Sequence, residues 1–221
     1  MIARQLPLAL TPAPDPTLDS FVPGSNVELL ERLRSAAAGA PDEPVIFLWG
    51  DPGCGRTHLL RGIAAAAPGA AYLAAQADFL AAADKRVVAV DDVERLDESR
   101  QIALFGMLNR ARETRGVVVA AGPVPPAQLA LREDLKTRLG WGLVYRVHPL
   151  SDEDKAKHLR AEAGRRGLRL PDEVVSYLLA RAPRDLHSLM GVLDRLDRQS
   201  LARQRPVTVP LLRELLNDPQ N

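Results

Sequence analysis

The sequence predicts an α/β fold in which a parallel sheet is flanked by helices, followed by a small domain made only of helices. Short apolar runs alternate with helical patterns between 45 and 147, and this alternation is typical of a parallel sheet. A Gly-rich loop joins the first apolar run to a helical pattern, and no strand pattern follows 151. We therefore expect three parts: a tail over 1–16, an α/β domain over 17–149 and a helical lid domain over 150–221.

Composition excludes several classes of protein. The chain has 221 residues with a net charge of +1, so no global positive field marks a nucleic-acid binder. Its one cysteine excludes an internal disulfide and fits a reducing compartment. Apolar runs are too short to cross a membrane, and no signal peptide is expected because prolines interrupt the N-terminus at Pro7, Pro12, Pro14 and Pro16. The expected location is the cytoplasm, without membrane contact.

The Gly-rich loop lies between a predicted strand at 45–49 and a predicted helix at 57–67. Glycines let the backbone curl so that successive N–H groups point at an anion, and the helix N-terminus adds its positive dipole. The sequence therefore predicts a phosphate-binding loop; the alternative is a Gly-rich turn without a ligand. The expected nucleotide-binding residues are Gly50, Asp51, Pro52, Gly53, Cys54, Gly55, Arg56, Thr57 and His58.

The loop departs from the motif G-x-x-x-x-G-K-[ST] at one fixed position, where Arg56 replaces lysine. Arginine keeps the positive charge, but its planar fork is not equivalent to a compact ammonium. The substitution favours nucleotide binding over fast hydrolysis, so weak or no intrinsic ATPase activity is expected. For Cys54, a small residue chosen for fit is the favoured interpretation over a catalytic thiol.

A second motif follows the predicted strand 87–90, where the apolar run ends in Asp91 and Asp92. Ligands of open α/β sheets bind at the carboxyl ends of the strands. Asp91 and the Thr57 hydroxyl are the expected Mg²⁺ ligands, and Asp92 is the expected catalytic carboxylate that orients or deprotonates water. The alternative is a strand that runs into an acidic surface loop.

The remaining pattern predicts the other elements. Ser25 or Asn26 is the expected N-cap of the first helix, and Ser151 the N-cap of the first lid helix. Further strands are expected at 71–73, 116–121 and 143–147. Helices are expected at 27–38, 76–83, 97–114, 129–139, 152–165, 171–181, 184–200 and 207–217.

Together these motifs resemble the DnaA-related AAA+ proteins, and among them the Hda regulators. A segment with basic residues before the last strand, Leu135–Leu143, is similar to the family's arginine-finger box. The other segments that carry the resemblance are 17–26, 48–60, 90–96 and 182–186. It covers 17–200, and the chain has no room for the added N-terminal and DNA-binding domains of DnaA.

The resemblance implies a function and a set of roles. Hda regulators bind the DNA polymerase III sliding clamp (beta subunit) and stimulate ATP hydrolysis by DnaA, which restrains replication initiation. The implied cofactors are ADP or ATP with Mg²⁺, a homo-oligomer is possible, and any DNA contact is indirect or weak. Arg138 matches the catalytic arginine finger, and Arg184 a lid contact with the nucleotide. The implied adenine-pocket residues are Phe21, Val22, Gly24 and Asn26.

The tail carries an apolar run for which two interpretations stay open. Its residues are Gln5, Leu6, Pro7, Leu8, Ala9 and Leu10. In the first, the run has no partner and either packs on its own domain or is disordered. In the second, it is a short linear motif that binds in a partner's groove. The resemblance implies the last of these, a clamp-binding peptide.

Two other functions compete with the regulator. An autonomous AAA+ ATPase, such as a loader or remodeller, is supported by the acidic pair, but Arg56 and the apolar end of a strand at 120–122 oppose it. In that place the family usually carries a polar sensor of the γ-phosphate. Direct DNA binding rests on a basic lid face and is opposed by the near-zero net charge. That face comprises Arg160, Arg165, Arg166 and Arg169.

Overall fold

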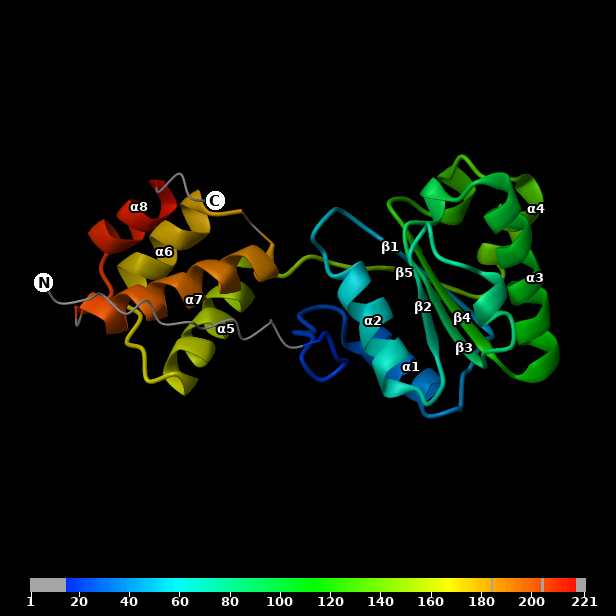
Figure 1. The fold of residues 1–221 in the computed structure, drawn as a ribbon, viewed down its shortest axis with the longest axis horizontal. Helices are drawn as coiled ribbons and strands as arrows, with labels where there is room; N and C mark the ends of the chain where they lie inside the picture. Colours follow the sequence, from blue (N-terminus) through cyan, green and yellow to red (C-terminus); the bar gives the residue numbers. More distant parts are fainter. Residues whose placement is uncertain (1–14, 184, 204, 218–221) are drawn as a thin grey trace, which may run out of the picture.

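The computed structural model describes residues 15–183, 185–203 and 205–217 (Figure 1). The expected clamp-binding residues Gln5–Leu10 and the expected nucleotide contact Arg184 lie outside the described residues. Within the described part, an α/β lobe and a lobe of helices lie side by side.

Five parallel strands form one sheet in the order β2-β3-β4-β1-β5, which confirms the predicted fold class. The register pairs Phe47 of β1 with Ala120 of β4 and with Val144 of β5. The strands are β1 (Val45–Trp49), β2 (Ala71–Leu73), β3 (Val87–Val90), β4 (Val117–Gly122) and β5 (Leu143–Arg146).

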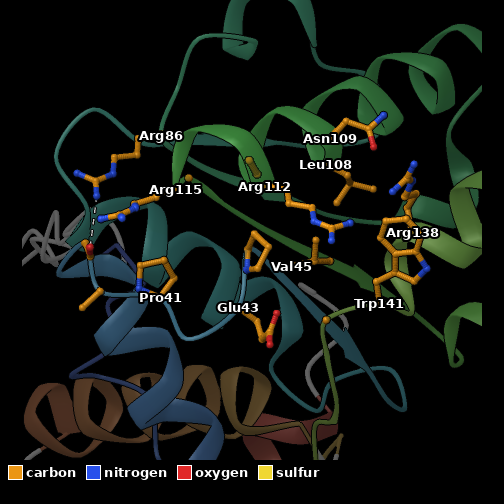
Figure 2. Close-up of a pocket in the computed structure, with 16 residues that line it drawn as sticks. Pro41, Glu43, Val45, Arg86, Leu108, Asn109, Arg112, Arg115, Arg138 and Trp141 are labelled. Atoms are coloured by element: carbon orange, nitrogen blue, oxygen red, sulfur yellow. Dashed lines mark hydrogen bonds between the residues drawn. The ribbon is translucent and has the colours of Figure 1, made fainter.

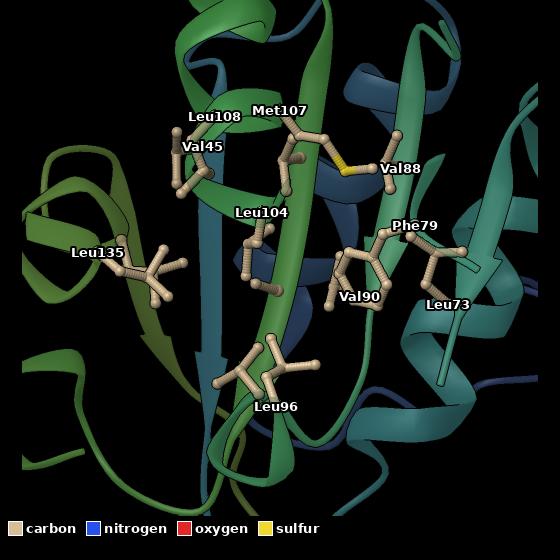
Figure 3. Close-up of a cluster of buried hydrophobic side chains, with 14 of the residues drawn as sticks. Val45, Leu73, Phe79, Val88, Val90, Leu96, Leu104, Met107, Leu108 and Leu135 are labelled. Carbon is tan, nitrogen blue, oxygen red and sulfur yellow. The ribbon is translucent and has the colours of Figure 1, made fainter. Parts of the chain in front are cut away.

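Helices cover both faces of this sheet (Figure 1), because its central strands are apolar on both sides. α1 (Val27–Ala37) and α2 (Arg56–Ala66) pack on one face, and α3 (Glu98–Thr114) and α4 (Glu133–Leu139) on the other. Successive residues of β1 point to opposite faces of the sheet. Phe47 belongs to the core beneath α3 and α4, in which Figure 3 shows Leu104 and Leu135. Ile46 belongs to the core beneath α1 and α2. Each fully buried side chain of this kind contributes about 1.5–3 kcal/mol.

The lid lobe has its own apolar core, which includes Leu159, Leu178, Leu193 and Leu212. The hydroxyl of Ser151 accepts a hydrogen bond from the Asp154 amide at 3.0 Å, so the predicted cap is observed. The lid helices are α5 (Asp152–Arg165), α6 (Asp172–Arg181), α7 (Leu186–Arg203) and α8 (Val209–Asn217).

Two predicted helices differ from the structure. The pattern at 76–83 forms only a short 3-10 helix, Leu80–Ala82, because the Asp78 carboxylate accepts the Leu80 amide in a local turn. The pattern at 129–139 becomes helical only at Glu133; the preceding residues include a 3-10 helix, Pro126–Gln128, and then Leu129 and Leu131 enter the core.

A third 3-10 helix, Val93–Arg95, follows β3. Within the described ranges, no helix is long and apolar enough to cross a membrane.

Candidate functional site

The Gly-rich loop lies at the carboxyl end of β1 and leads directly into α2. Gly53 (φ +78°) and Gly55 (φ +107°) adopt left-handed backbone conformations that other residues rarely take, and Gly55 is the N-cap residue of α2. A Cβ on Gly55 would lie 2.8 Å from the Phe21 ring. The loop therefore holds its curl through glycine, and it presents the start of a helix, a natural anion site.

Arg56 places at this loop a cation with one unsatisfied nitrogen atom. Its Nη1 atom is buried and has no hydrogen-bond partner among the described residues. A buried polar group normally has a partner, and leaving a charged one without it is costly. A phosphate oxygen at the loop would satisfy this atom, so the residues present fit a nucleotide phosphate.

The expected metal ligands lie together at the carboxyl edge of the sheet. The Thr57 hydroxyl donates a hydrogen bond of 2.7 Å to the Asp91 carboxylate, and the Tyr72 hydroxyl donates to the same oxygen at 2.9 Å. Within the described ranges no group of three or more His, Cys, Asp or Glu could hold a metal ion by itself. That is ordinary for Mg²⁺, which takes one or two protein ligands together with phosphates and waters.

Tyr72 was missed by sequence reasoning, because it belongs to no motif. Burial, followed by the neighbouring Asp91 charge, raises the pKa of its hydroxyl, so Tyr72 stays a hydrogen-bond donor. The only signal was its place on β2, the strand that pairs with β3 directly before the acidic pair.

Asp92 adopts a left-handed conformation (φ +50°), which is uncommon for a residue with a side chain. The Asp92 amide donates a hydrogen bond to the Asp91 carboxylate at 3.0 Å. The Arg95 guanidinium lies 3.7 Å from the Asp92 carboxylate. Glu94 follows, and burial together with the charge of Asp92 raises the pKa of its carboxyl group. Strained residues of this kind cluster at functional sites.

A cavity of about 240 Å³ separates this loop from the lid. Phe21, Val22 and the loop residues Gly53–His58 line it, and the Phe21 and His58 rings lie 5.5 Å apart. Gly50, Asp51 and Pro52 begin the loop outside this lining.

Gly24 and Asn26 also lie outside the lining, and Asn26 attaches its segment to the chain before the lid. Asn26 does not cap α1 through its side chain. Instead, its amide group donates to the His148 carbonyl at 2.9 Å, and its oxygen accepts from the His148 amide at 2.8 Å.

The lid closes the cavity with residues that were not among the expected site residues, although two of them lie in the segment 182–186 that carries the resemblance. Lys155, Asp185, Leu186 and His187 line it. A Cβ on Gly53 would lie 3.0 Å from the Cβ of Asp185, so the start of α7 rests on the loop. Lys155 is buried, and its amine lies 3.2 Å from the Asp152 carboxylate. Proximity along the chain could not have revealed these contacts.

Arg138, the expected arginine finger, lies away from this cavity, near the edge where the strands begin. Its guanidinium lies 3.7 Å from the centroid of the Trp141 ring (Figure 2). The centroid of the Phe105 ring lies 5.3 Å from the same guanidinium. Two aromatic rings therefore orient the charged group. It lines a cleft with the residues that precede β1, β4 and β5, whereas the Gly-rich loop follows β1.

The basic lid face offers fewer free charges than the sequence suggests. Arg160 pairs with Asp172 at 2.8 Å, and Arg166 contacts both Glu162 and Asp194. Arg165 also pairs with Glu162. These pairs cancel much of the charge that phosphate contacts would need.

The strand order, the Gly-rich loop after β1, the acidic pair after β3 and the helical lid define the class: this is an AAA+ protein. A family model described as "Hda, lid domain" matches residues 152–216. A Haemophilus influenzae protein named only as uncharacterized is 32% identical over 234 residues, covering 97% of this chain and 99% of that protein.

Solved structures share the fold. Domain III of DnaA from Thermotoga maritima superposes with a TM-score of 0.76 at 22% identity, over 93% of this chain and 97% of that one. AMPPCP-bound DnaA from Aquifex aeolicus gives 0.72 at 23% identity, over 87% and 69%. The chain belongs to the same family as that Haemophilus influenzae protein: it is an AAA+ protein with a DnaA-like fold and an Hda-like lid.

Proposed function

We propose that the chain binds an adenine nucleotide with Mg²⁺ between the Gly-rich loop and the lid. The observation that carries this is the buried, unpartnered Nη1 of Arg56 beside the paired oxygens of Thr57 and Asp91. The nucleotide would bring negative charge to Arg56, while Thr57 and Asp91 would hold the metal. Strand β4 lies between β1 and β3 and ends in Ala120, Ala121 and Gly122, so it offers no polar side chain that would contact the γ-phosphate. We expect ADP to bind at least as well as ATP.

We further propose that the chain acts on DnaA and speeds hydrolysis of the ATP that DnaA holds. Arg138 would supply the arginine finger. Family membership supports this role, and so does the position of Arg138. Arg138 lines a cleft where the strands begin, whereas the Gly-rich loop of the same chain follows the end of β1. A finger that serves a neighbouring subunit needs that separation.

The chemistry asked of Arg138 is electrostatic. Its guanidinium would neutralise charge that develops on the γ-phosphate during transfer to water, a contribution of roughly 10³–10⁵ in rate. The Trp141 ring holds the guanidinium in place before the partner arrives, which reduces the entropy lost on docking.

Replacing the finger tests this role. Arg138→Ala should lower stimulation of DnaA's ATP hydrolysis by roughly 10³, measured as phosphate release, while ADP binding by the variant stays at the wild-type level. Arg110→Ala is the matched control, because Arg110 lies on α3 paired with Asp84 at 2.8 Å and outside the cleft. Undiminished stimulation by Arg138→Ala would remove the role.

The clamp is the second proposed partner, through the segment Gln5–Leu10. Gln5→Ala combined with Leu6→Ala should abolish binding to the sliding clamp and leave thermal stability and ADP binding unchanged. A loss of stability would instead assign the segment to the protein's own core. Residues 17–149 and 150–221 are the proposed domains, joined by a hinge at 149–151.

The alternative, an autonomous ATPase of the same clade, is favoured by one observation, the left-handed backbone at Asp92 in the acidic pair. Under the regulator proposal, the purified chain turns over ATP very slowly. Brisk turnover without partners, abolished by Asp92→Asn, would support the alternative.

A further inference from the structure

A cleft of about 850 Å³ lies where the sheet begins, at the edge opposite the Gly-rich loop. Its lining includes residues directly before four strands: Pro44 before β1, Arg86 before β3, Gly116 before β4 and Gly142 before β5. Leu108 and Arg112 of α3 line one side of the cleft, and the segment with Pro41 and Glu43 lines another (Figure 2). No role described above uses this cleft beyond Arg138.

The lining is strongly basic. Arginines contributed by several elements face a single glutamate, Glu43: they are Arg86, Arg112, Arg115 and Arg138. Arg86 donates a hydrogen bond to the Gly39 carbonyl at 3.3 Å. Within the described part of the chain, none of the four pairs with a carboxylate. Figure 2 shows them spread along the cleft, with Arg86 and Arg115 near one end, Arg112 between, and Arg138 at the other.

Trp141 organises one end of this row. Its ring lies 3.7 Å from the Arg138 guanidinium and 5.3 Å from that of Arg112. Trp141 is 51% exposed, yet guanidiniums occupy the neighbourhood of its ring. The ring therefore serves to orient cations, and it is not free as a platform for stacked bases.

The shape and charge favour a small, highly charged anion. Several guanidiniums that face one cavity match a ligand with several negative charges, and their forks match phosphate oxygens. The volume lies within the range of about 300–1,000 Å³ typical of small-molecule sites. Apolar side chains of Pro41, Pro44 and Leu108 line the same cleft, and they offer a surface to the rest of such a ligand. A DNA duplex is too broad to enter.

We propose that this cleft binds the phosphate chain of a nucleoside oligophosphate, with Arg112 and Arg115 acting beside Arg138. The phosphate chain has two possible sources: a free nucleotide, or a nucleotide held by a partner subunit. The second source rests on the proposed function. In both cases the cleft is a phosphate site separate from the Gly-rich loop of the same chain.

The first arm of the test uses inorganic tripolyphosphate and the full chain. Arg56→Ala with Thr57→Ala removes the loop site, and calorimetry at low salt then counts the sites that remain. We expect one, weakened roughly tenfold by Arg115→Asn and by Arg112→Gln, about the value of one charged hydrogen bond. Asparagine suits residue 115 because it tolerates the left-handed backbone there (φ +55°).

Arg110→Gln is the matched control, since it removes the same charge from the same helix outside the cleft. Melting curves verify that each variant folds, which is expected because Arg112 and Arg115 are exposed.

The second arm measures stimulation of DnaA's ATP hydrolysis against the concentration of this chain. We expect Arg115→Asn and Arg112→Gln to raise the half-saturating concentration roughly tenfold, whereas Arg138→Ala lowers the maximal rate. An effect in the first arm alone assigns free nucleotide as the ligand, and an effect in the second alone assigns the partner's nucleotide.

The proposal is overturned if Arg115→Asn and Arg112→Gln match Arg110→Gln in both arms. If Arg138→Ala still removes stimulation in that case, the proposed function stands and only the wider site is lost. If all three variants stimulate normally and the first arm still shows cleft binding, the proposed function fails and the cleft is a site for free nucleotide.

Discussion

The two edges of the sheet present positive charge in different ways. At the carboxyl edge, backbone N–H groups and a helix N-terminus form the candidate anion site, shaped by left-handed Gly53 and Gly55. At the amino edge, the backbone contributes little, and arginine side chains from separate elements face one cleft. The first site is fixed by the path of a short loop, and the second by how distant segments pack.

This difference teaches where each site is vulnerable. A site built from backbone geometry fails when the loop cannot keep its dihedral angles, even if every charge remains. A site built from side chains fails by degrees as charges are removed, because each arginine contributes separately. The edges also differ in cover: among the described residues, lid residues line the cavity at the carboxyl edge and none lines the cleft at the amino edge.

The largest effect on nucleotide binding within this comparison is expected from Gly53→Ala. A methyl group would strain the left-handed backbone and lie 3.0 Å from the Asp185 Cβ, so the loop or Asp185 must shift. We expect the strained loop to shift, so that its N–H groups no longer point at the phosphate. We expect ADP affinity to fall roughly a hundredfold, because more than one charged hydrogen bond is lost. Calorimetry with ADP measures the change.

Gly69→Ala is the matched control for that prediction. Gly69 has a similar dihedral angle (φ +71°), but a Cβ there meets nothing within 4 Å. Both variants should lose roughly 1–2 kcal/mol of folding stability. Only Gly53→Ala should show a lower affinity for ADP. Equal ADP affinities in the two variants would show that the loop geometry does not build the site.

A smaller effect is expected from Tyr72→Phe, which removes the hydrogen bond to the Asp91 carboxylate. A carboxylate held less firmly binds metal less well. Nucleotide affinity in Mg²⁺ should fall roughly three- to tenfold, and the difference should vanish in EDTA. Tyr177→Phe in the lid is the control. A loss that persists without metal would contradict this role for Tyr72.

The smallest effect concerns pH and the lid. Burial lowers the pKa of His158 below its ordinary 6.5, opposed by Glu162 and assisted by Arg165. The unfolded chain therefore takes up this proton first. The folding stability linked to His158 is fully present above pH 6.5. Part of it is lost as the pH falls through 6.5 toward the lower pKa of His158 in the folded protein.

His158→Gln removes this proton uptake, so its melting temperature should change less between pH 7 and 5 than that of the wild type. Tripolyphosphate binding in the amino-edge cleft should not differ between the two proteins, because the lid does not line that cleft. Parallel melting curves for the two proteins would show that His158 does not couple to folding.

Sequence alone predicted most of the fold and the candidate site at one of the two edges, the carboxyl edge. Alternating apolar runs predict the parallel strands because buried strands and amphipathic helices have distinct periods. The loop at Gly53 and the pair at Asp91 were readable because their geometry follows from adjacent residues. Where local turns competed, as at Asp78, the helical pattern misled.

Only the tertiary structure joined residues far apart in the chain. It brought Tyr72 to Asp91, set Asp185 of the lid on Gly53, and gathered Arg86, Arg112 and Arg138 around one cleft. Each of these contacts depends on strand order and helix packing, which no local pattern encodes. A loop motif consists of consecutive residues, so the sequence shows it directly. A site made of side chains from distant segments forms only when the strands and helices pack together.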